Sequence, residues 1–119
     1  VTKKFKALSV HQPYATWIAE GSKTIEFRSW YTQHRGPLVI CSTRLPNVHG
    51  YFSGRALCIV DMVDCRPSEW LDSDAACVVY RPEYKYSWVL KHPASITPPP
   101  AVKGQQGLFN IEIKIKNEC

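Results

Sequence analysis

Three charged residues that could act together, Lys23, Glu26 and Arg28, lie within six positions of one another. In a strand, successive side chains point to opposite faces, so Glu26 and Arg28 would share one face while Ile25 and Phe27 pack into the core. Two interpretations of such a cluster are open. It is either an ordinary ion pair on a solvated strand face or a site where the two cations hold an anionic group.

The residues that follow this cluster favour the second interpretation. Aromatic, imidazole and guanidinium groups crowd the expected loop, at Ser29, Trp30, Tyr31, His34 and Arg35. Aromatic rings stack on bases, whereas Arg and Lys hold phosphates, and this combination is typical of proteins that bind single-stranded nucleic acid. Together with Lys23 and Arg28, these residues form a predicted nucleic-acid-binding surface.

Two distant stretches add candidates to that surface. His11 and Tyr14 lie where a helix is expected to begin, and the free N–H groups at the start of a helix attract phosphate. Lys103 precedes a turn over residues 104–107 with two glycines, where a nucleic-acid backbone could approach closely. A plain helix flank and a plain connecting loop are the competing interpretations.

The overall composition favours one domain over residues 1–119 with a polyanionic partner. Of the 119 residues 45% are apolar, which is enough for a single hydrophobic core. A total of 15 Lys and Arg against 10 Asp and Glu gives a formal net charge of +5. A positive balance of this kind favours nucleic acid, RNA or DNA, as the partner.

The sequence shows no targeting or membrane segment. No apolar segment typical of a signal peptide follows the first residues, and no apolar run reaches the roughly 18 residues of a transmembrane helix. We therefore expect an intracellular protein without a membrane partner, cytoplasmic or, in a eukaryote, nuclear. Because the sequence begins at Val1 and not at Met, we also expect a processed or excised piece, which leaves protein partners of a larger molecule open.

No metal and no cofactor are expected. The five cysteines form no C-x-x-C pair, and the four histidines show no ligand spacing. Cys41 and Cys58 lie in apolar runs, where a free cysteine is usually a small buried hydrophobic residue. The sequence also contains no P-loop, no G-x-G-x-x-G and no H-E-x-x-H motif.

The pattern of apolar residues predicts about six strands and two or more short helices. Strands are expected over residues 5–10, 23–30, 36–42, 54–63, 86–91 and 108–115. A helix of about two turns is expected between Pro13 and Gly21, and a second should begin at residues 67–71 with Ser68 as its N-cap. The proline-rich residues 92–100 should be extended. These elements favour an α+β fold, a small β-barrel with helices, over a doubly wound sheet.

Three blocks of sequence occur in order: Leu8-Ser9-Val10-His11-Gln12-Pro13-Tyr14, then Gly21-x-Lys23-x-x-Glu26-x-Arg28-Ser29-Trp30, then His34-Arg35-Gly36-Pro37-Leu38. Together they resemble the ASCH domain, the activating-signal-cointegrator homology family of the PUA-like superfamily. The segment from Trp88 to Phe109 resembles the closing segment of that family, so the resemblance covers nearly the full chain. Residues 28–36 are especially similar to the domain at the C-terminus of eukaryotic transcription cointegrators.

The resemblance implies a PUA-like β-barrel with a cleft beside the first helix, and an association with RNA or DNA in transcription coactivation or RNA processing. By the same resemblance, Lys23, Glu26 and Arg28 line that cleft. The first function open to such a domain is that of a nucleic-acid-binding module with a basic cleft and adjacent aromatic rings.

The second function is that of a small hydrolase, a ribonuclease or an enzyme similar to acetylcytidine amidohydrolases. In it, Glu26 would be the general base and Lys23 would stabilise developing negative charge. The amidohydrolases of this family have a threonine where this chain has Glu26, and that departure removes the expected nucleophile. Thr24, an even position like Glu26, is expected to share the polar face and keeps hydrolysis open. A third possibility is a protein-interaction domain without nucleic acid.

Overall fold

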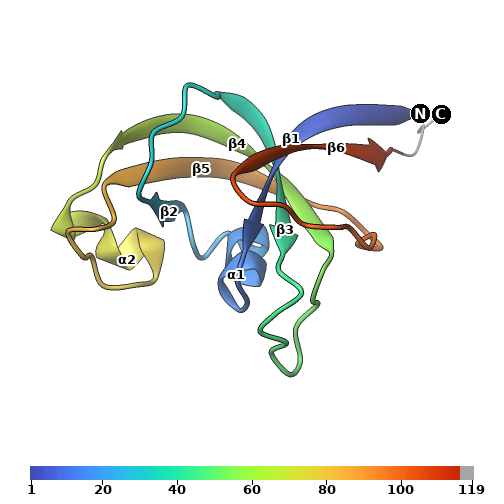
Figure 1. The fold of residues 1–119 in the computed structure, drawn as a ribbon, viewed down its shortest axis with the longest axis horizontal. Helices are drawn as coiled ribbons and strands as arrows, with labels where there is room; N and C mark the ends of the chain where they lie inside the picture. The colour runs from blue at the N-terminus through green and yellow to red at the C-terminus, as the bar shows by residue number, and fades with distance from the viewer. Residues whose placement is uncertain (116–119) are drawn as a thin grey trace.

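One curled sheet of six strands forms the body of the protein in the computed structural model, which describes residues 1–115 (Figure 1). The strand order is β2-β5-β4-β3-β1-β6. The elements along the chain are β1 (Thr2–Val10), α1 (Tyr14–Glu20), β2 (Ile25–Arg28), β3 (Gly36–Ser42), β4 (Ala56–Pro67), the 3₁₀ turn η1 (Trp70–Asp72), α2 (Ser73–Ala76), β5 (Tyr86–Ser95) and β6 (Leu108–Lys114). Six strands and two short helices confirm the predicted α+β fold, and the curled sheet forms a half-barrel.

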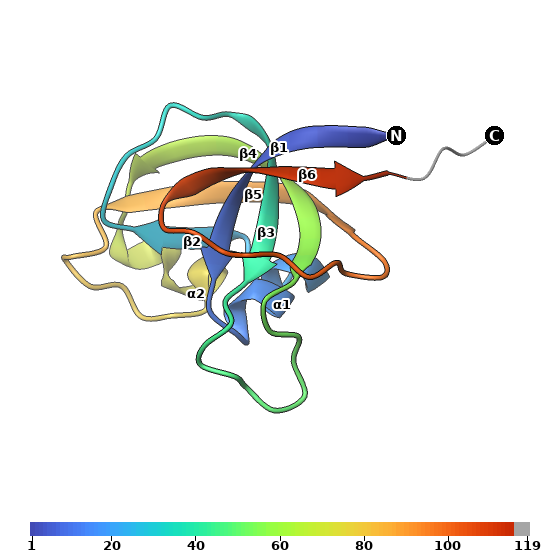
Figure 2. The same cartoon turned by 45° about the vertical axis from the view of Figure 1, so that its right-hand side comes forward.

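Most residues of the predicted site lie in the connection from β1 to β3. These two strands pair in parallel, whereas every other neighbouring pair in the sheet is antiparallel. Because parallel neighbours need a crossover, the chain leaves β1, forms α1, adds β2 at the far edge of the sheet and returns as β3. Both views show α1 beneath the curled sheet, close to β3 and β4 (Figures 1 and 2). Residues 11–35, which hold most of the predicted site, belong to this crossover.

The helix α1 begins and ends where the sequence predicts. Pro13 occupies the N-cap position, and Gly21 ends the helix in the left-handed conformation with φ +86°, which glycine adopts without steric cost. The backbone N–H groups of Ser22 and Lys23 both donate to the carbonyl of Trp17, so the chain folds back over the last turn. Among residues 1–115, no helix is long and apolar enough to cross a bilayer.

The main core lies between α1 and the inner face of the sheet. Its fully buried side chains include Leu8 from β1, Ile18 from α1 and Trp88 from β5. A second cluster, which includes Ala7, Val39, Cys41 and Phe109, lies on the outer face. Cys41 and Cys58 are buried as predicted, and burial raises the pKa of each thiol to about 12.

Irregular pairing between β4 and β5 curls the sheet and corrects one prediction. The register shifts between Ile59 and Asp61, and again between Met62 and Asp64. Extra residues of this kind bend a strand and increase its twist. His92 lies opposite the first shift with φ +54°, so residues 92–100 are not uniformly extended as we predicted. The prolines do not exclude pairing here, because β5 continues through Pro93 as far as Ser95.

The second helix also differs from the prediction. It begins as the 3₁₀ turn η1 with Glu69, not Ser68, as the N-cap residue. The Ser68 hydroxyl instead donates to the carbonyl of Tyr84. Asp72 sets this start, because its carboxylate accepts the backbone N–H of Glu69 at 3.0 Å and both terminal nitrogens of Arg66 at 2.7 and 2.9 Å.

The two ends of the described chain lie side by side at one end of the sheet (Figure 1). The Ile115 N–H donates to the carbonyl of Val1 at 2.7 Å, and the amino group of Val1 lies 3.4 Å from the Ile115 carbonyl oxygen. This contact extends the antiparallel pairing of β1 with β6, which runs from Leu8 opposite Leu108 to Thr2 opposite Lys114.

Candidate functional site

A cavity of about 830 Å³ opens where the end of β1, the start of α1, β2 and the loop before β6 meet. Its wall contains seven of the predicted site residues, which are His11, Tyr14, Lys23, Glu26, Arg28, Ser29 and Trp30, together with residues 105–107 of the turn that follows Lys103. These residues come from four separate segments of the chain. The fold therefore gathers the predicted cluster at one hollow, which we call the triad cavity.

The three charged residues form one connected unit in the wall of this cavity. The Lys23 Nζ lies 3.3 Å from Oε1 of Glu26. Arg28 donates from Nε and from Nη2 to the other carboxylate oxygen, at 3.1 and 2.8 Å. Arg28 Nη2 also donates to the Ser9 carbonyl at 2.9 Å. As predicted, Glu26 and Arg28 share one face of β2, while Ile25 and Phe27 are buried on the other.

Lys23 does not present its ammonium group to solvent, contrary to the expectation that it contacts phosphates directly. Its side chain is only 2% exposed. Besides Glu26, the ammonium group contacts the Ala76 carbonyl of α2 and lies 5.4 Å from the centre of the Tyr14 ring. The turn at Gly21 directs the side chain inward beneath α1, and these partners satisfy the cation there.

The other cation of the unit, Arg28, remains partly accessible. Its side chain is 24% exposed. Nε and Nη2 are engaged by Glu26 and Ser9, whereas no residue between 1 and 115 accepts a hydrogen bond from Nη1. Because a guanidinium group carries five N–H donors in a rigid fork, Arg28 can hold Glu26 and still donate to a ligand.

The charges that line the triad cavity balance one another. Lys23 and Arg28 supply two positive charges, and Glu26 and Glu83 supply two carboxylates. The expectation of a basic cleft is therefore wrong for this cavity. Glu83 escaped the sequence analysis because the loop between α2 and β5 carries no local pattern that relates it to β2.

Aromatic rings form a large part of the cavity wall. The Trp30 ring lies edge-on against the buried Trp88, with centroids 4.8 Å apart, which fixes its orientation. Tyr84 stacks on Phe27 with centroids 5.3 Å apart and an angle of 11° between the rings. Trp30 was predicted, whereas Tyr84 was missed for the same reason as Glu83. The rings provide flat apolar surface beside the charged unit.

Neutral polar groups complete the cavity. The Ser9 hydroxyl is buried and has no hydrogen-bond partner among residues 1–115. Gly104 packs over it so closely that an added Cβ would lie 2.9 Å from this oxygen. Gln105 and Gln106 place two exposed amides at the rim. Nδ1 of His11 lies 2.9 Å from the Thr43 hydroxyl, so this histidine is held at the mouth of the cavity.

Several predicted residues lie outside the triad cavity. Tyr31 packs edge-on against Tyr86, and the Arg35 guanidinium lies 5.9 Å from the Tyr31 ring and 3.9 Å from Asp64. Lys103 is exposed in the loop before β6 but does not line the cavity. Thr24 lines a separate hollow of about 380 Å³. It does not join Glu26, because β2 begins only at Ile25 and the strand alternation does not reach Thr24.

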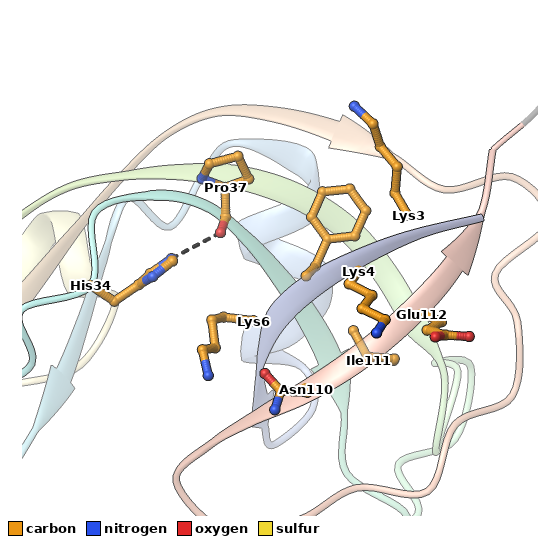
Figure 3. Close-up of a pocket in the computed structure, with 9 residues that line it drawn as sticks. Lys3, Lys4, Lys6, His34, Pro37, Asn110, Ile111 and Glu112 are labelled. Atoms are coloured by element: carbon orange, nitrogen blue, oxygen red, sulfur yellow. Dashed lines mark hydrogen bonds between the residues drawn. The ribbon is translucent and has the colours of Figure 1, made fainter. Parts of the chain in front are cut away.

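His34 lines a third hollow, beside the first half of β1. This hollow has a volume of about 960 Å³ and contains Lys3, Lys4 and Lys6 (Figure 3). The sequence analysis did not single out these lysines, although three of them within four positions were a visible signal. Among residues 1–115, no three His, Cys, Asp or Glu side chains gather as metal ligands would.

Comparison with known proteins identifies the family. Residues 8–100 match the family described as the ASCH domain. Activating signal cointegrator 1 of Homo sapiens is 28% identical over 132 aligned residues, which cover 91% of this chain and 22% of the human protein. The Mus musculus protein of the same name is 27% identical with the same coverage. The chain thus spans about a fifth of the length of these relatives.

Solved structures agree with this assignment. The crystal structure of ASCH from Zymomonas mobilis superposes with a TM-score of 0.69 at 15% identity, covering 87% of this chain and 85% of that one. A mutant of the same protein gives 0.67 at 15% identity, covering 90% and 89%. The chain therefore belongs to the ASCH domain family and has the PUA-like half-barrel fold.

Proposed function

We propose that this ASCH domain is a nucleic-acid-binding module whose triad cavity receives a nucleotide, base first. The observation that carries the proposal is the Lys23–Glu26–Arg28 unit in the wall of an open cavity of about 830 Å³, with Trp30 beside it. The Trp30 ring offers a stacking surface, and the free Nη1 of Arg28 offers a donor to a base edge or a sugar hydroxyl.

The charge balance of the cavity favours a base or a sugar over a phosphate. Two cations and two carboxylates give no net positive potential. A base, in contrast, needs alternating donors and acceptors together with a flat apolar wall. The rim amides of Gln105 and Gln106 provide donors and acceptors, and the ring of Trp30 provides the flat wall.

The similarity to activating signal cointegrator 1 supports a role in a transcription coactivator or in RNA processing. In such a setting the module would bring a larger protein to RNA or DNA, and other parts of that protein would bind protein partners. The net charge of +5 supports the same partner class.

A hydrolase is the second candidate, and the proximity of Lys23 Nζ to the Glu26 carboxylate favours it. Two contacts oppose it. One oxygen of Glu26 forms an ion pair with Lys23, and the other accepts two hydrogen bonds from Arg28. The carboxylate is therefore poorly placed to take a proton from water. Lys23 has its ammonium group enclosed by Glu26, Ala76 and Tyr14. We therefore place binding first.

The test is a titration of the same short mixed sequence as labelled RNA, single-stranded DNA and duplex DNA at about 50 and about 200 mM salt. Arg28→Met should weaken binding about tenfold, the equivalent of one charge-assisted hydrogen bond. Arg55→Met is the matched control, because Arg55 is exposed and donates to the Pro99 carbonyl away from the cavity. Its affinity should equal that of the unmodified protein, apart from the small effect of one lost charge.

The same samples separate binding from hydrolysis. A binding module returns the oligonucleotide at its original length after incubation. Shortened RNA that disappears with Glu26→Gln, while binding persists, would establish the hydrolase instead. No affinity for any of the three nucleic acids would refute the proposed function altogether.

A further inference from the structure

The hollow beside β1 has an excess of positive charge, which the triad cavity lacks. Its charged and polar lining comprises Lys3, Lys4, Lys6, His34, Asn110 and Glu112 (Figure 3). The lining therefore carries three cations and one carboxylate; Lys4 and Lys6 share the strand face of Glu112, whereas Lys3 lies on the opposite face. Among residues 1–115, none of the three lysines takes part in a salt bridge, and all three are exposed. This basic hollow is therefore free to attract an anion.

The basic hollow and the triad cavity lie on one face of the β1–β6 pair. Lys4 is opposite Glu112, Lys6 opposite Asn110 and Leu8 opposite Leu108 in the antiparallel register. Since alternate residues of a strand share a face, Lys4 and Lys6 lie on the face that carries Leu8 and Val10. Val10 lines the triad cavity, as does Gly107, the neighbour of Leu108. Lys6 and Val10 are four residues apart, or about 13 Å along the strand.

A second segment connects the two hollows. The loop between β2 and β3 carries Trp30 in the wall of the triad cavity and His34 in the wall of the basic hollow. His34 is held in place through Nε2, 2.9 Å from the Pro37 carbonyl oxygen. Because a carbonyl only accepts, Nε2 carries a proton in this contact.

We propose that the basic hollow binds the phosphates of the same nucleic-acid strand whose base enters the triad cavity. The inference rests on the proposed function and adds a direction to it: the strand follows β1 from Val10 toward Lys3. Lys4 and Lys6 neutralise backbone charge, and the triad cavity provides contact with a base. The contacts with phosphates supply affinity that falls as salt rises, and the contact with a base supplies discrimination between bases.

A different role for these lysines must be separated from this one. Residues 2–5 of β1 pair only with β6, because pairing with β3 starts at Lys6 opposite Leu38. The other edge of that segment is therefore open, and lysines commonly protect such an edge from pairing with another chain. If that is their only role, the lysines protect solubility and do not contact a ligand.

The experiment compares two double variants with equal loss of charge. Lys4→Gln/Lys6→Gln removes two cations from the basic hollow, and Arg55→Gln/Lys91→Gln removes two exposed cations that line neither the basic hollow nor the triad cavity. Affinity is measured over a salt series for the same sequence as RNA, single-stranded DNA and duplex DNA. Size-exclusion chromatography checks that each variant stays monodisperse.

The hollow variant should lose about tenfold or more in affinity at low salt, and its plot of log affinity against log salt should flatten by about 1.4 for a single strand or about 1.8 for a duplex. The control variant should keep nearly the full slope. The nucleic acid whose slope falls by the full amount expected for its own form, about 1.4 or about 1.8, is the one that follows β1.

Equal slopes for the hollow variant and the control would overturn the inference, while leaving the proposed function intact if the unmodified protein binds. Aggregation of the hollow variant with unchanged affinity of its monomeric fraction would assign the lysines to edge protection and would also overturn it. If the unmodified protein binds none of the three nucleic acids, the proposed function fails, and the phosphate track fails with it.

Discussion

The Lys23–Glu26–Arg28 unit and the Arg66–Asp72–Ser87 cluster each place one carboxylate between strong donors, but the first lines the triad cavity and the second lines none of the three hollows described above. At Asp72 the carboxylate accepts hydrogen bonds from both terminal nitrogens of Arg66 and from the buried hydroxyl of Ser87, the last at 2.8 Å. Arg66 belongs to β4 and Ser87 to β5, so the cluster fixes η1 to the sheet. These hydrogen bonds hold the elements together, and none of the three residues lines the triad cavity.

The two cations that bind Glu26 also donate to other groups. Lys23 continues to Ala76 of α2, and Arg28 continues to Ser9 of β1 with one nitrogen to spare. The unit therefore joins three elements around a space and keeps a donor for whatever enters it. Residue type alone therefore does not separate a structural ion pair from a candidate binding site. What separates them is whether a donor is left unused beside a cavity.

Glu26→Ala should cause the largest loss of folding stability. It leaves the ammonium group of Lys23, 2% exposed, without its counterion, and removing one partner of a buried pair costs about 3 to 5 kcal/mol of unfolding free energy. Urea denaturation followed by circular dichroism measures this loss. A second variant, Lys23→Met/Glu26→Gln, removes both charges and should recover much of the stability. A double variant as unstable as Glu26→Ala would show that the ion pair is not the cause.

The Asp72 cluster should respond to acid. Hydrogen bonds from Arg66, followed by those from Ser87 and the Glu69 backbone, lower the pKa of Asp72 from 3.8 to about 2. Because the folded-state pKa is the lower one, the stabilisation is complete above about pH 4 and is lost as pH falls toward 2. The loss amounts to about 2 kcal/mol.

Thermal unfolding between pH 5 and pH 2 measures that loss, with Asp72→Asn as the control. The variant should be less stable at neutral pH and should lack this part of the acid dependence. It should also bind nucleic acid as well as the unmodified protein does, because Asp72 does not line the triad cavity. Weakened binding by Asp72→Asn would remove the contrast between the two clusters.

The smallest expected effect is that of Gly104→Ala. The new Cβ would approach the Ser9 hydroxyl to 2.9 Å, so the loop before β6 must shift by a few tenths of an ångström. We expect a stability change of about 1 kcal/mol or less and a measurable change in affinity, since the next residues form the cavity rim. Ser9→Ala/Gly104→Ala reduces the crowding and should restore the affinity in part. If both variants bind nucleic acid with unchanged affinity, the loop before β6 does not take part in binding.

Local patterns in the sequence were sufficient for the number and order of the strands and for the first helix, although several strand ends were misplaced, that of β2 among them. The alternation around Glu26 placed two charges on one face, and Gly21 marked the helix end, because each depends only on neighbouring residues. The partners of Lys23 were not predictable. Ala76 lies 53 positions away and approaches only after η1 and α2 have folded against β2.

The charge of the site was also beyond local reasoning. A count of Lys and Arg near Glu26 suggests a basic cleft, but the balance in the cavity depends on Glu83, which a distant loop supplies. The basic surface lies instead at residues 3–6, where the run of lysines resembles an ordinary solvated strand face until the register with β6 is known. Pairing between strands, rather than residue spacing, decides which charges share a hollow.

The backbone contact between Val1 and Ile115 has a consequence for protein architecture. A unit that starts and finishes at the same point can be spliced into a surface turn of a host protein without separating the flanking segments of that host. Residues 1–115 could therefore be inserted between two adjacent strands of an unrelated scaffold, and the inserted domain would be attached to that scaffold next to β1 and β6.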